Sequence, residues 1–225
     1  MTLKPKNKEL LVVATPIGNL GDASDRMKEV LASVGVVFAE DARVTGTLLK
    51  KFAIETRIVS VHQHTDVKKI EELLHDVEES VAYVSDAGTP GISDPGGAVV
   101  AAAVTAGFTV TPVPGPSALT AALSIAGFKT DRFRFFGFPP SKKGRKSFFE
   151  SITATEEAVA LYESKHRVLK TLEQLPQDRP MVLCRELTKL HETVYRGTAR
   201  AILEQINTTS QKGEFVLVLA PTNWK

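Results

Sequence analysis

Short apolar runs alternate with amphipathic segments along the first half of the chain. The apolar runs predict β-strands at 10–14, 36–39, 58–61, 81–84 and 108–112. Helical spacing of apolar or small residues predicts helices at 24–34, 44–52, 67–79 and 97–106. This alternation favours an α/β architecture with a parallel, doubly wound sheet.

The second half has a different pattern. Its predicted strands are 132–137, 158–162, 181–184, 192–196 and 215–220. Less helix separates the last three, so we expect a mixed sheet with antiparallel pairs. Between the halves, 113–117 holds two prolines around a glycine, which indicates a hinge. The chain is therefore predicted to form two α/β domains, 1–113 and 117–225, with an active-site cleft between them.

The composition fits a globular protein with a substantial core. Of the 225 residues, 43% are hydrophobic. The single cysteine, Cys184, excludes an internal disulfide and is interpreted as a small core residue in an apolar strand. No apolar run approaches ~20 residues, and the lysine-rich N-terminus does not resemble a signal peptide. We therefore expect a soluble, cytoplasmic protein without a membrane span.

Charge is distributed unevenly along the chain. Residues 1–128 carry 11 Lys and Arg against 15 Asp and Glu, whereas residues 129–225 carry 17 against 11. The basic half is the better candidate to face a polyanion. A solvated surface explains the same asymmetry, so charge alone does not establish nucleic-acid binding.

The segment 85–97 is rich in glycine, proline and aspartate and joins a predicted strand to a predicted helix. Glycine permits close backbone approach, and proline fixes turns. Asp86 stands at the carboxyl end of a strand, where open α/β sheets bind ligands. Asp94 and Pro95 are predicted as the N-cap and first residue of the helix. A cap does not account for 86–93, so a ligand loop is favoured over an ordinary turn.

Two other loops, 15–22 and 40–43, also follow predicted strands of this sheet. Because the carboxyl ends of parallel strands share one edge, we expect the three loops to meet there. Neither a Walker A motif nor a GxGxxG fingerprint is present. Kinases, nucleoside triphosphatases and standard dinucleotide enzymes are therefore disfavoured.

Glu40, Asp41 and Arg43 place two acids and a base just past a strand. They can position a hydroxyl nucleophile or act as a general base. Alternatively, they cap the helix that begins near Val44, with Arg43 paired locally. The pattern alone does not separate these interpretations.

His62 and His64 lie at strand spacing and are expected on one face. A zinc pair is conceivable, but no third ligand has suitable spacing, so no metal site is predicted. Substrate contact or surface polarity is the preferred interpretation.

Aromatic and basic residues are interleaved over 132–138 and continue into the basic run 142–146. Such a patch can stack bases and hold phosphates. Most of the phenylalanines are interpreted as core-facing strand residues, and the basic run as a polyanion contact. The predicted RNA-binding residues are Lys142, Lys143, Arg145, Lys146, Lys165 and Arg167. For Lys165 and Arg167, decoration of a helix surface is the alternative.

Seven segments resemble the motifs of one family. They are 14–22, 39–43, 84–96, 114–118, 131–138, 185–192 and 212–216. The family is the bacterial 16S ribosomal RNA cytidine 2′-O-ribose methyltransferases, within the tetrapyrrole methylase superfamily. The matches run in order from about residue 10 to residue 219, and 84–96 is highly specific.

The resemblance implies a two-domain tetrapyrrole methylase fold that binds S-adenosylmethionine in the interdomain cleft and works as a homodimer. Members methylate the ribose 2′-hydroxyl of a decoding-site cytidine in 16S rRNA of the small ribosomal subunit. By analogy, the cofactor contacts are Pro16, Ile17, Gly18, Asp86, Ala87, Gly88, Ile92, Ser117, Ala118 and Tyr162. We hypothesise that Glu40 or Asp41 accepts or orients the hydroxyl proton, and that Arg43 holds a nearby phosphate or carboxylate.

The sequence departs from the family pattern at three places. Ala42 and Val44 replace polar residues, Lys165 replaces a proline, and no additional C-terminal segment is predicted beyond Lys225. The last departure leaves open how the substrate is gripped. Two alternatives remain: a methylase of the same superfamily acting on a tetrapyrrole or other small molecule, and a non-catalytic RNA-binding relative.

Overall fold

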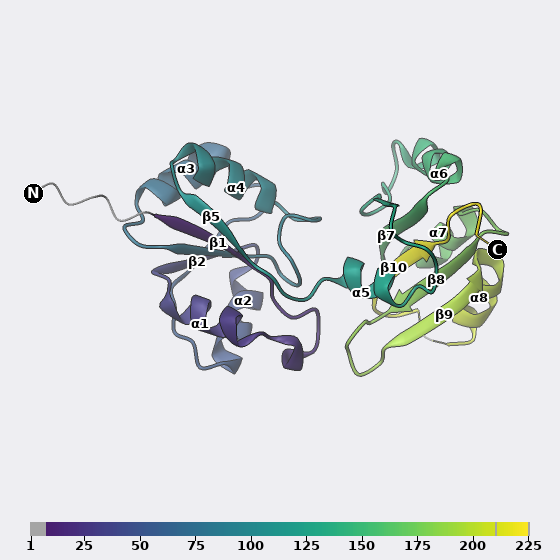
Figure 1. Cartoon of the computed structure of the whole chain (residues 1–225), viewed down its shortest axis with the longest axis horizontal. Helices are drawn as coiled ribbons and strands as arrows, with labels where there is room; N and C mark the ends of the chain where they lie inside the picture. Colours follow the sequence, from purple (N-terminus) through teal and green to yellow (C-terminus); the bar gives the residue numbers. More distant parts are fainter. Residues whose placement is uncertain (1–7, 210, 225) are drawn as a thin grey trace, which may run out of the picture. The chain divides into compact units, whose positions relative to one another are not determined.

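The computed structural model describes residues 8–209 and 211–224 (Figure 1). The chain divides into two compact units between Ser117 and Ala118. Each unit contains one five-stranded sheet. The boundary falls at the end of the proline-rich segment that interrupts regular structure.

The sheet of the first unit is entirely parallel. Its strands are β1 (Glu9–Val13), β2 (Val36–Ala39), β3 (Ile58–Ser60), β4 (Val81–Val84) and β5 (Thr109–Val113). They are arranged in the order β3-β2-β4-β1-β5. Leu10 pairs with Val81 on one side and with Val110 on the other. The predicted parallel, doubly wound sheet is confirmed.

α-Helices cover both faces of this sheet (Figure 1). They are α1 (Asp25–Ser33), α2 (Ala42–Lys51), α3 (Val67–His75) and α4 (Gly96–Thr105), with a short 3₁₀ turn at Leu20–Asp22. Met27 and Leu49 of α1 and α2 pack in one core, and Ile70 and Val99 of α3 and α4 pack in another. Strand residues alternate between the two cores, because successive side chains of a strand point to opposite faces.

Two expectations in this unit are wrong in detail. Helix α3 ends at His75 rather than at residue 79, because the Asp76 N–H donates to the carbonyls of Glu72 and Leu74 and closes the last turn. Strand β3 ends at Ser60, so the two histidines lie in a turn and not on a strand face. There the His64 N–H donates to His62 Nδ1 over 3.1 Å. The described residues contain no group of three or more His, Cys, Asp or Glu side chains suited to hold a metal ion.

The second unit has a mixed sheet, as predicted. Its strands are β6 (Phe133–Phe135), β7 (Ala158–Ser164), β8 (Pro180–Arg185), β9 (Thr193–Thr198) and β10 (Glu214–Leu219). The order is β6-β7-β10-β8-β9. The β6–β7 pair is parallel, whereas β7–β10, β10–β8 and β8–β9 are antiparallel.

Three of the described helices of the second unit share one core with this sheet, and a fourth lies outside that core. The three are α6 (Arg145–Ala154), α7 (Val168–Gln174) and α8 (Ala199–Asn207), and the fourth is α5 (Ala118–Ser124). Ile152, Leu172 and Ile202 bring α6, α7 and α8 into the core. Cys184 is fully buried, as predicted for a small core residue, and burial raises its thiol pKa to about 11.

The core assignment for most phenylalanines of 133–138 is wrong. Phe133 and Phe138 are 41% and 50% exposed. Of the four phenylalanines, only Phe136 packs partly buried against the core. The physical reason is that β6 is a three-residue strand at the edge of its sheet, so it has a neighbour on one side only.

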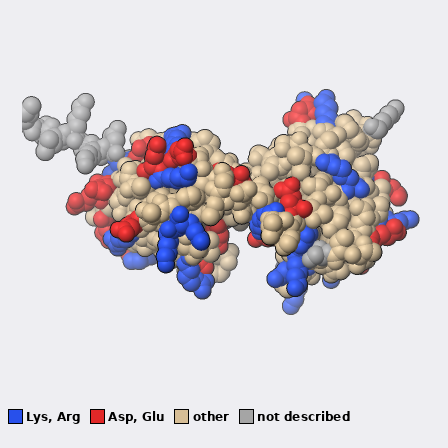
Figure 2. Space-filling model, turned by 90° about the horizontal axis from the view of Figure 1, so that it is seen from below, with Lys and Arg blue, Asp and Glu red and all other residues tan. Residues whose placement is uncertain are grey.

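No helix within the described ranges is both long enough and apolar enough to span a membrane. Blue and red side chains are interspersed over the visible face in Figure 2, with wide uncharged areas between them. The basic excess of the second half therefore does not form one continuous surface on this face.

Candidate active site

The loops that follow β1, β2 and β4 meet at one edge of the parallel sheet, as predicted. Thr15 and Gly88 form a two-way backbone bridge, with N–H to O distances of 3.0 and 3.1 Å. The Glu40 N–H donates to the Val84 carbonyl over 3.2 Å. Because the three strands are neighbours and parallel, their carboxyl ends converge at this point.

Glu40, Asp41 and Asp86 are linked across two of these loops. The Asp41 N–H donates to Asp86 Oδ1 over 3.0 Å, and the Asp86 N–H donates to Glu40 Oε2 over 3.4 Å. The two backbone groups thus hold two acidic side chains at one end of the sheet. This proximity follows from the parallel pairing of β2 with β4, which brings the carboxyl ends of the two strands together.

Crowding of the acids changes their proton affinity. Burial raises the pKa of Glu40, a hydrogen bond from the Asp86 backbone lowers it, and the charges of Asp86, Asp94 and Asp41 raise it. The pKa of Asp86 is also raised, mainly by burial. Both carboxyl groups therefore keep their protons to a higher pH than usual.

Asp41 and Arg43 make the local capping arrangement that was one of the two interpretations. The Asp41 carboxylate accepts from the Arg43 N–H over 2.9 Å as the N-cap of α2. The Arg43 guanidinium also donates to both carboxylate oxygens, over 3.1 and 2.6 Å. This pairing lowers the Asp41 pKa to about 2. Asp41 is therefore a weak proton acceptor compared with Glu40.

The glycine-rich loop approaches the β1 loop closely at Gly88. Gly88 has φ +81°, and a Cβ at this position would lie 3.1 Å from Ile17 Cγ2. Both facts favour glycine. Ile17 is buried at 8% exposure, whereas Ile92, farther along the loop, is 44% exposed.

The predicted capping role of Asp94 is corrected by one residue. Helix α4 begins at Gly96, and Pro95 occupies the N-cap without a side-chain bond. Asp94 instead accepts from the N–H groups of Gly91, over 2.9 and 2.8 Å, and Gly96, over 2.8 Å. It thereby fixes the curvature of the loop as well as the start of the helix.

Three side chains missed by sequence reasoning support the loops. The Tyr83 hydroxyl donates to Asp94 Oδ1 over 3.4 Å, and burial raises its pKa. Thr89 donates to the Pro116 carbonyl over 3.0 Å. Thr15 Oγ1 is buried and has no hydrogen-bond partner within the described residues. The available signal was their position: Tyr83 lies in β4, and Thr15 and Thr89 lie in the loops that follow β1 and β4.

Ala118 and Tyr162, also expected at the cofactor, belong to the second unit. Tyr162 lies within β7, which continues to Ser164, so it is not at a strand end as expected. Its ring packs on Phe135 and Phe138, with centroid distances of 4.9 and 5.4 Å. Ser117 is the last residue before α5. The cofactor role of these residues stays a prediction.

The predicted RNA-binding residues fall into two groups. Lys142, Lys143, Lys146 and Lys165 are exposed. Arg145 is 7% exposed, and its guanidinium donates to three acceptors inside the protein. Arg167 donates to the Pro139 carbonyl and pairs with buried Glu163 over 3.1 Å. Both guanidinium groups are thus bonded inside the protein, and the RNA-binding role of the six residues stays a prediction.

Similarity to known proteins places the chain in a known class of enzymes. The family model of the tetrapyrrole (corrin/porphyrin) methylases matches residues 9–203. Uroporphyrin-III-C-methyltransferase from Thermus thermophilus has a similar fold, with TM-score 0.65 and 19% identity over 96% of this chain and 94% of that one. Diphthine synthase gives TM-score 0.71 and 16% identity over 94% and 90%.

Relatives with higher sequence identity indicate which group within this class the chain belongs to. The chain is 45% identical over 218 residues to ribosomal RNA small subunit methyltransferase I of Synechocystis sp., covering 94% of this chain and 78% of the relative. The Escherichia coli O157:H7 protein of the same name is 43% identical over 94% and 77%. The chain therefore belongs to the tetrapyrrole methylases, within the group of ribosomal RNA small subunit methyltransferase I proteins.

Proposed function

We propose that this protein transfers a methyl group from S-adenosylmethionine to the ribose 2′-hydroxyl of a decoding-site cytidine in 16S rRNA. The names of the relatives support a ribosomal RNA substrate in the small subunit. The observation that carries the chemistry is the convergence of Glu40, Asp41 and Asp86 at one edge of the parallel sheet.

The residues at this edge suit S-adenosylmethionine. Glu40, Asp41, Asp86 and Asp94 are close enough to influence one another's charge, and an acidic environment complements a cationic sulfonium. The unpartnered buried hydroxyl of Thr15 offers a polar group that a ligand can satisfy. The residues that would hold the cofactor in this unit are Pro16, Ile17, Gly18, Asp86, Ala87, Gly88 and Ile92.

When bound, S-adenosylmethionine supplies an electrophilic methyl group. The task left to the protein is to align the ribose hydroxyl and help remove its proton, and alignment can supply most of the acceleration. Glu40 is a better proton acceptor than Asp41, because its pKa is raised whereas the pKa of Asp41 is lowered by its pair with Arg43. Asp86, whose pKa is also raised, is assigned to the cofactor in this proposal. Arg43 binds a phosphate or carboxylate in this proposal, since its side chain is 90% exposed despite the pair with Asp41.

The exposed lysines of the second unit contact RNA phosphates in this proposal, and the active form is a homodimer. Lys142, Lys143, Lys146 and Lys165 remain available for this role because they lie on the surface. Arg145 and Arg167 support them from inside rather than by direct contact.

Methyl transfer from labelled S-adenosylmethionine tests the function. The acceptors are small ribosomal subunits from a strain that lacks the corresponding modification, with porphyrinoid precursors as the alternative acceptor. We expect label only in 16S rRNA, at one cytidine, and as a ribose 2′-O-methyl group. Label in the porphyrinoid arm would replace the proposal with the small-molecule methylase, and no cofactor binding at millimolar concentration would favour the non-catalytic relative.

A further inference from the structure

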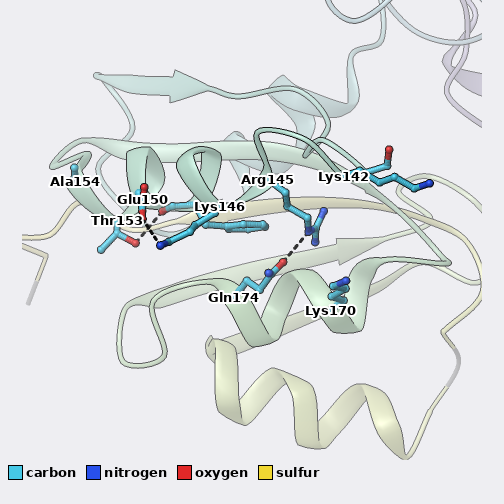
Figure 3. Close-up of a pocket in the computed structure, with 10 residues that line it drawn as sticks. Lys142, Arg145, Lys146, Glu150, Thr153, Ala154, Lys170 and Gln174 are labelled. Carbon is cyan, nitrogen blue, oxygen red and sulfur yellow. Dashed lines mark hydrogen bonds and ion pairs between the residues drawn. The ribbon is translucent and has the colours of Figure 1, made fainter.

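A groove on the second unit lies between α6 and α7 and was not recognised in the sequence. Its volume is about 760 Å³. Four of its lining residues are basic and one is acidic: Lys142, Arg145, Lys146, Lys170 and Glu150. Figure 3 shows that these side chains come from α6, from α7 and from the segment before α6.

Arg145 joins the two helices at the base of the groove. Its Nε donates to Gln174 Oε1 over 2.7 Å (Figure 3). Its Nη2 donates to Thr171 Oγ1 over 2.8 Å. Its Nη1 donates to the Pro140 carbonyl over 3.0 Å, and the guanidinium stacks 4.9 Å from the Phe149 ring centroid. These contacts fix its position, so Arg145 is a rigid positive charge beneath the groove.

This charge is only partly balanced inside the protein. The Thr171 hydroxyl, which accepts from Arg145, donates in turn to Glu163 Oε2 over 2.6 Å. The Glu163 side chain is fully buried. The same carboxylate pairs with Arg167 over 3.1 Å. One carboxylate is thus shared by two guanidinium groups, and the network of Arg145, Glu163 and Arg167 carries one excess positive charge.

An uncompensated charge with little access to water attracts an anion strongly. The exposed lysines at the rim add to this attraction, although Lys146 lies 3.8 Å from Glu150. Lys142 and Lys170 have no ion pair with any described residue. The groove is therefore positive both at its base and along its rim.

We propose that the groove between α6 and α7 binds the phosphate backbone of the substrate RNA, with Lys142, Lys146 and Lys170 as the contacts. This inference rests on the proposed function and names where the RNA is gripped. The proposal adds Lys170 to the RNA-binding residues. Arg145 is a positioning residue: it links α6 to α7 and makes the electrostatic potential of the groove more positive. The excess positive charge of the buried network favours a polyanion here over a basic or apolar partner.

The test compares two triple variants with equal loss of charge. One replaces the groove lysines, Lys142→Ala, Lys146→Ala and Lys170→Ala. The matched control replaces three exposed lysines of the first unit, Lys50→Ala, Lys51→Ala and Lys68→Ala. Binding of a transcribed 16S rRNA fragment that contains the decoding region is measured between 50 and 200 mM salt, in the same buffers for each protein. Circular dichroism and S-adenosylmethionine binding report on folding.

Each phosphate contact contributes about 0.7–0.9 to the slope of log K against log salt. We expect the groove variant to lose about two units of slope and roughly tenfold or more of its affinity, with cofactor binding unchanged. The control should keep the wild-type slope to within about half a unit. Equal slopes for the groove variant and the wild type would overturn the proposal.

Methylation of small ribosomal subunits separates this proposal from the proposed function. If the wild type methylates them and the groove variant binds RNA normally, the groove assignment fails and the function stands. If RNA binding depends on the groove but the wild type transfers no methyl group, the function fails and the groove stands.

Discussion

At the scale of single residues, hydrogen-bond partners decide which charged side chains remain available for chemistry. The sequence left Glu40 and Asp41 as alternative proton acceptors, but Asp41 caps α2 and pairs with Arg43. Arg145 and Lys142 belong to the same basic run, but tertiary contacts bury Arg145 and leave Lys142 exposed. Sequence spacing predicted where charges gather, whereas their partners depend on elements far apart in the chain.

The raised pKa of Glu40 determines how the reaction rate depends on pH in acidic solution. A proton acceptor with a raised pKa loses its active form at a higher pH as the solution is acidified. As the pH is lowered, we expect the single-turnover rate to begin to fall at a pH above 4.5, the ordinary pKa of glutamate. The measurement is the rate against pH with saturating cofactor and RNA. A rate that stays constant down to the ordinary glutamate pKa would contradict this assignment.

At the scale of elements, most strands were predictable because they are short apolar runs, and the parallel order of the first sheet followed from the alternation with helices. The ends of elements were less predictable. Helix α3 stops at His75, and β6 is a short edge strand that leaves Phe133 exposed. Local composition does not reveal which strand will lie at an edge.

Adjacent glycines at the start of α4 offer a matched test of the loop. A Cβ on Gly96 would lie 2.8 Å from Asp94 Oδ1 and 2.9 Å from the Gly91 backbone nitrogen, whereas a Cβ on Gly97 meets no atom within 4 Å. We expect Gly96→Ala to destabilise the protein by about 1–3 kcal/mol and to weaken cofactor binding. Gly97→Ala should be neutral or stabilising by up to ~1 kcal/mol. Denaturant unfolding and calorimetry measure both effects, and equal behaviour of the two variants would show that Asp94 does not shape the loop.

Arg179 is a structural link that sequence reasoning missed. Its buried guanidinium donates to four backbone carbonyls, those of Ala220, Ile152, Thr155 and Glu157. We expect Arg179→Met to cost about 2–4 kcal/mol, because the buried carbonyls lose their donors. Urea unfolding compares this variant with Lys129→Met, a change at an exposed residue. A loss no larger than that of the control would show that the four bonds contribute little.

At the scale of the whole molecule, the two units divide the proposed work. The first unit carries the acidic loops for the cofactor and the chemistry, and the second carries the basic groove for RNA. The fold class was predictable from patterns that repeat along each half. The groove was not, because it combines Lys142 with Lys170 through the packing of α6 and α7.

The central claim is that the converging loops of the first unit perform methyl transfer, with Glu40 as the proton acceptor. Single-turnover methylation of small ribosomal subunits, at saturating cofactor, compares Glu40→Gln with Asp41→Asn. Asparagine can still cap α2, so we expect Asp41→Asn to keep most of the wild-type rate. Glu40→Gln should lose roughly 10²-fold or more while still binding S-adenosylmethionine. Full activity of Glu40→Gln would contradict the claim.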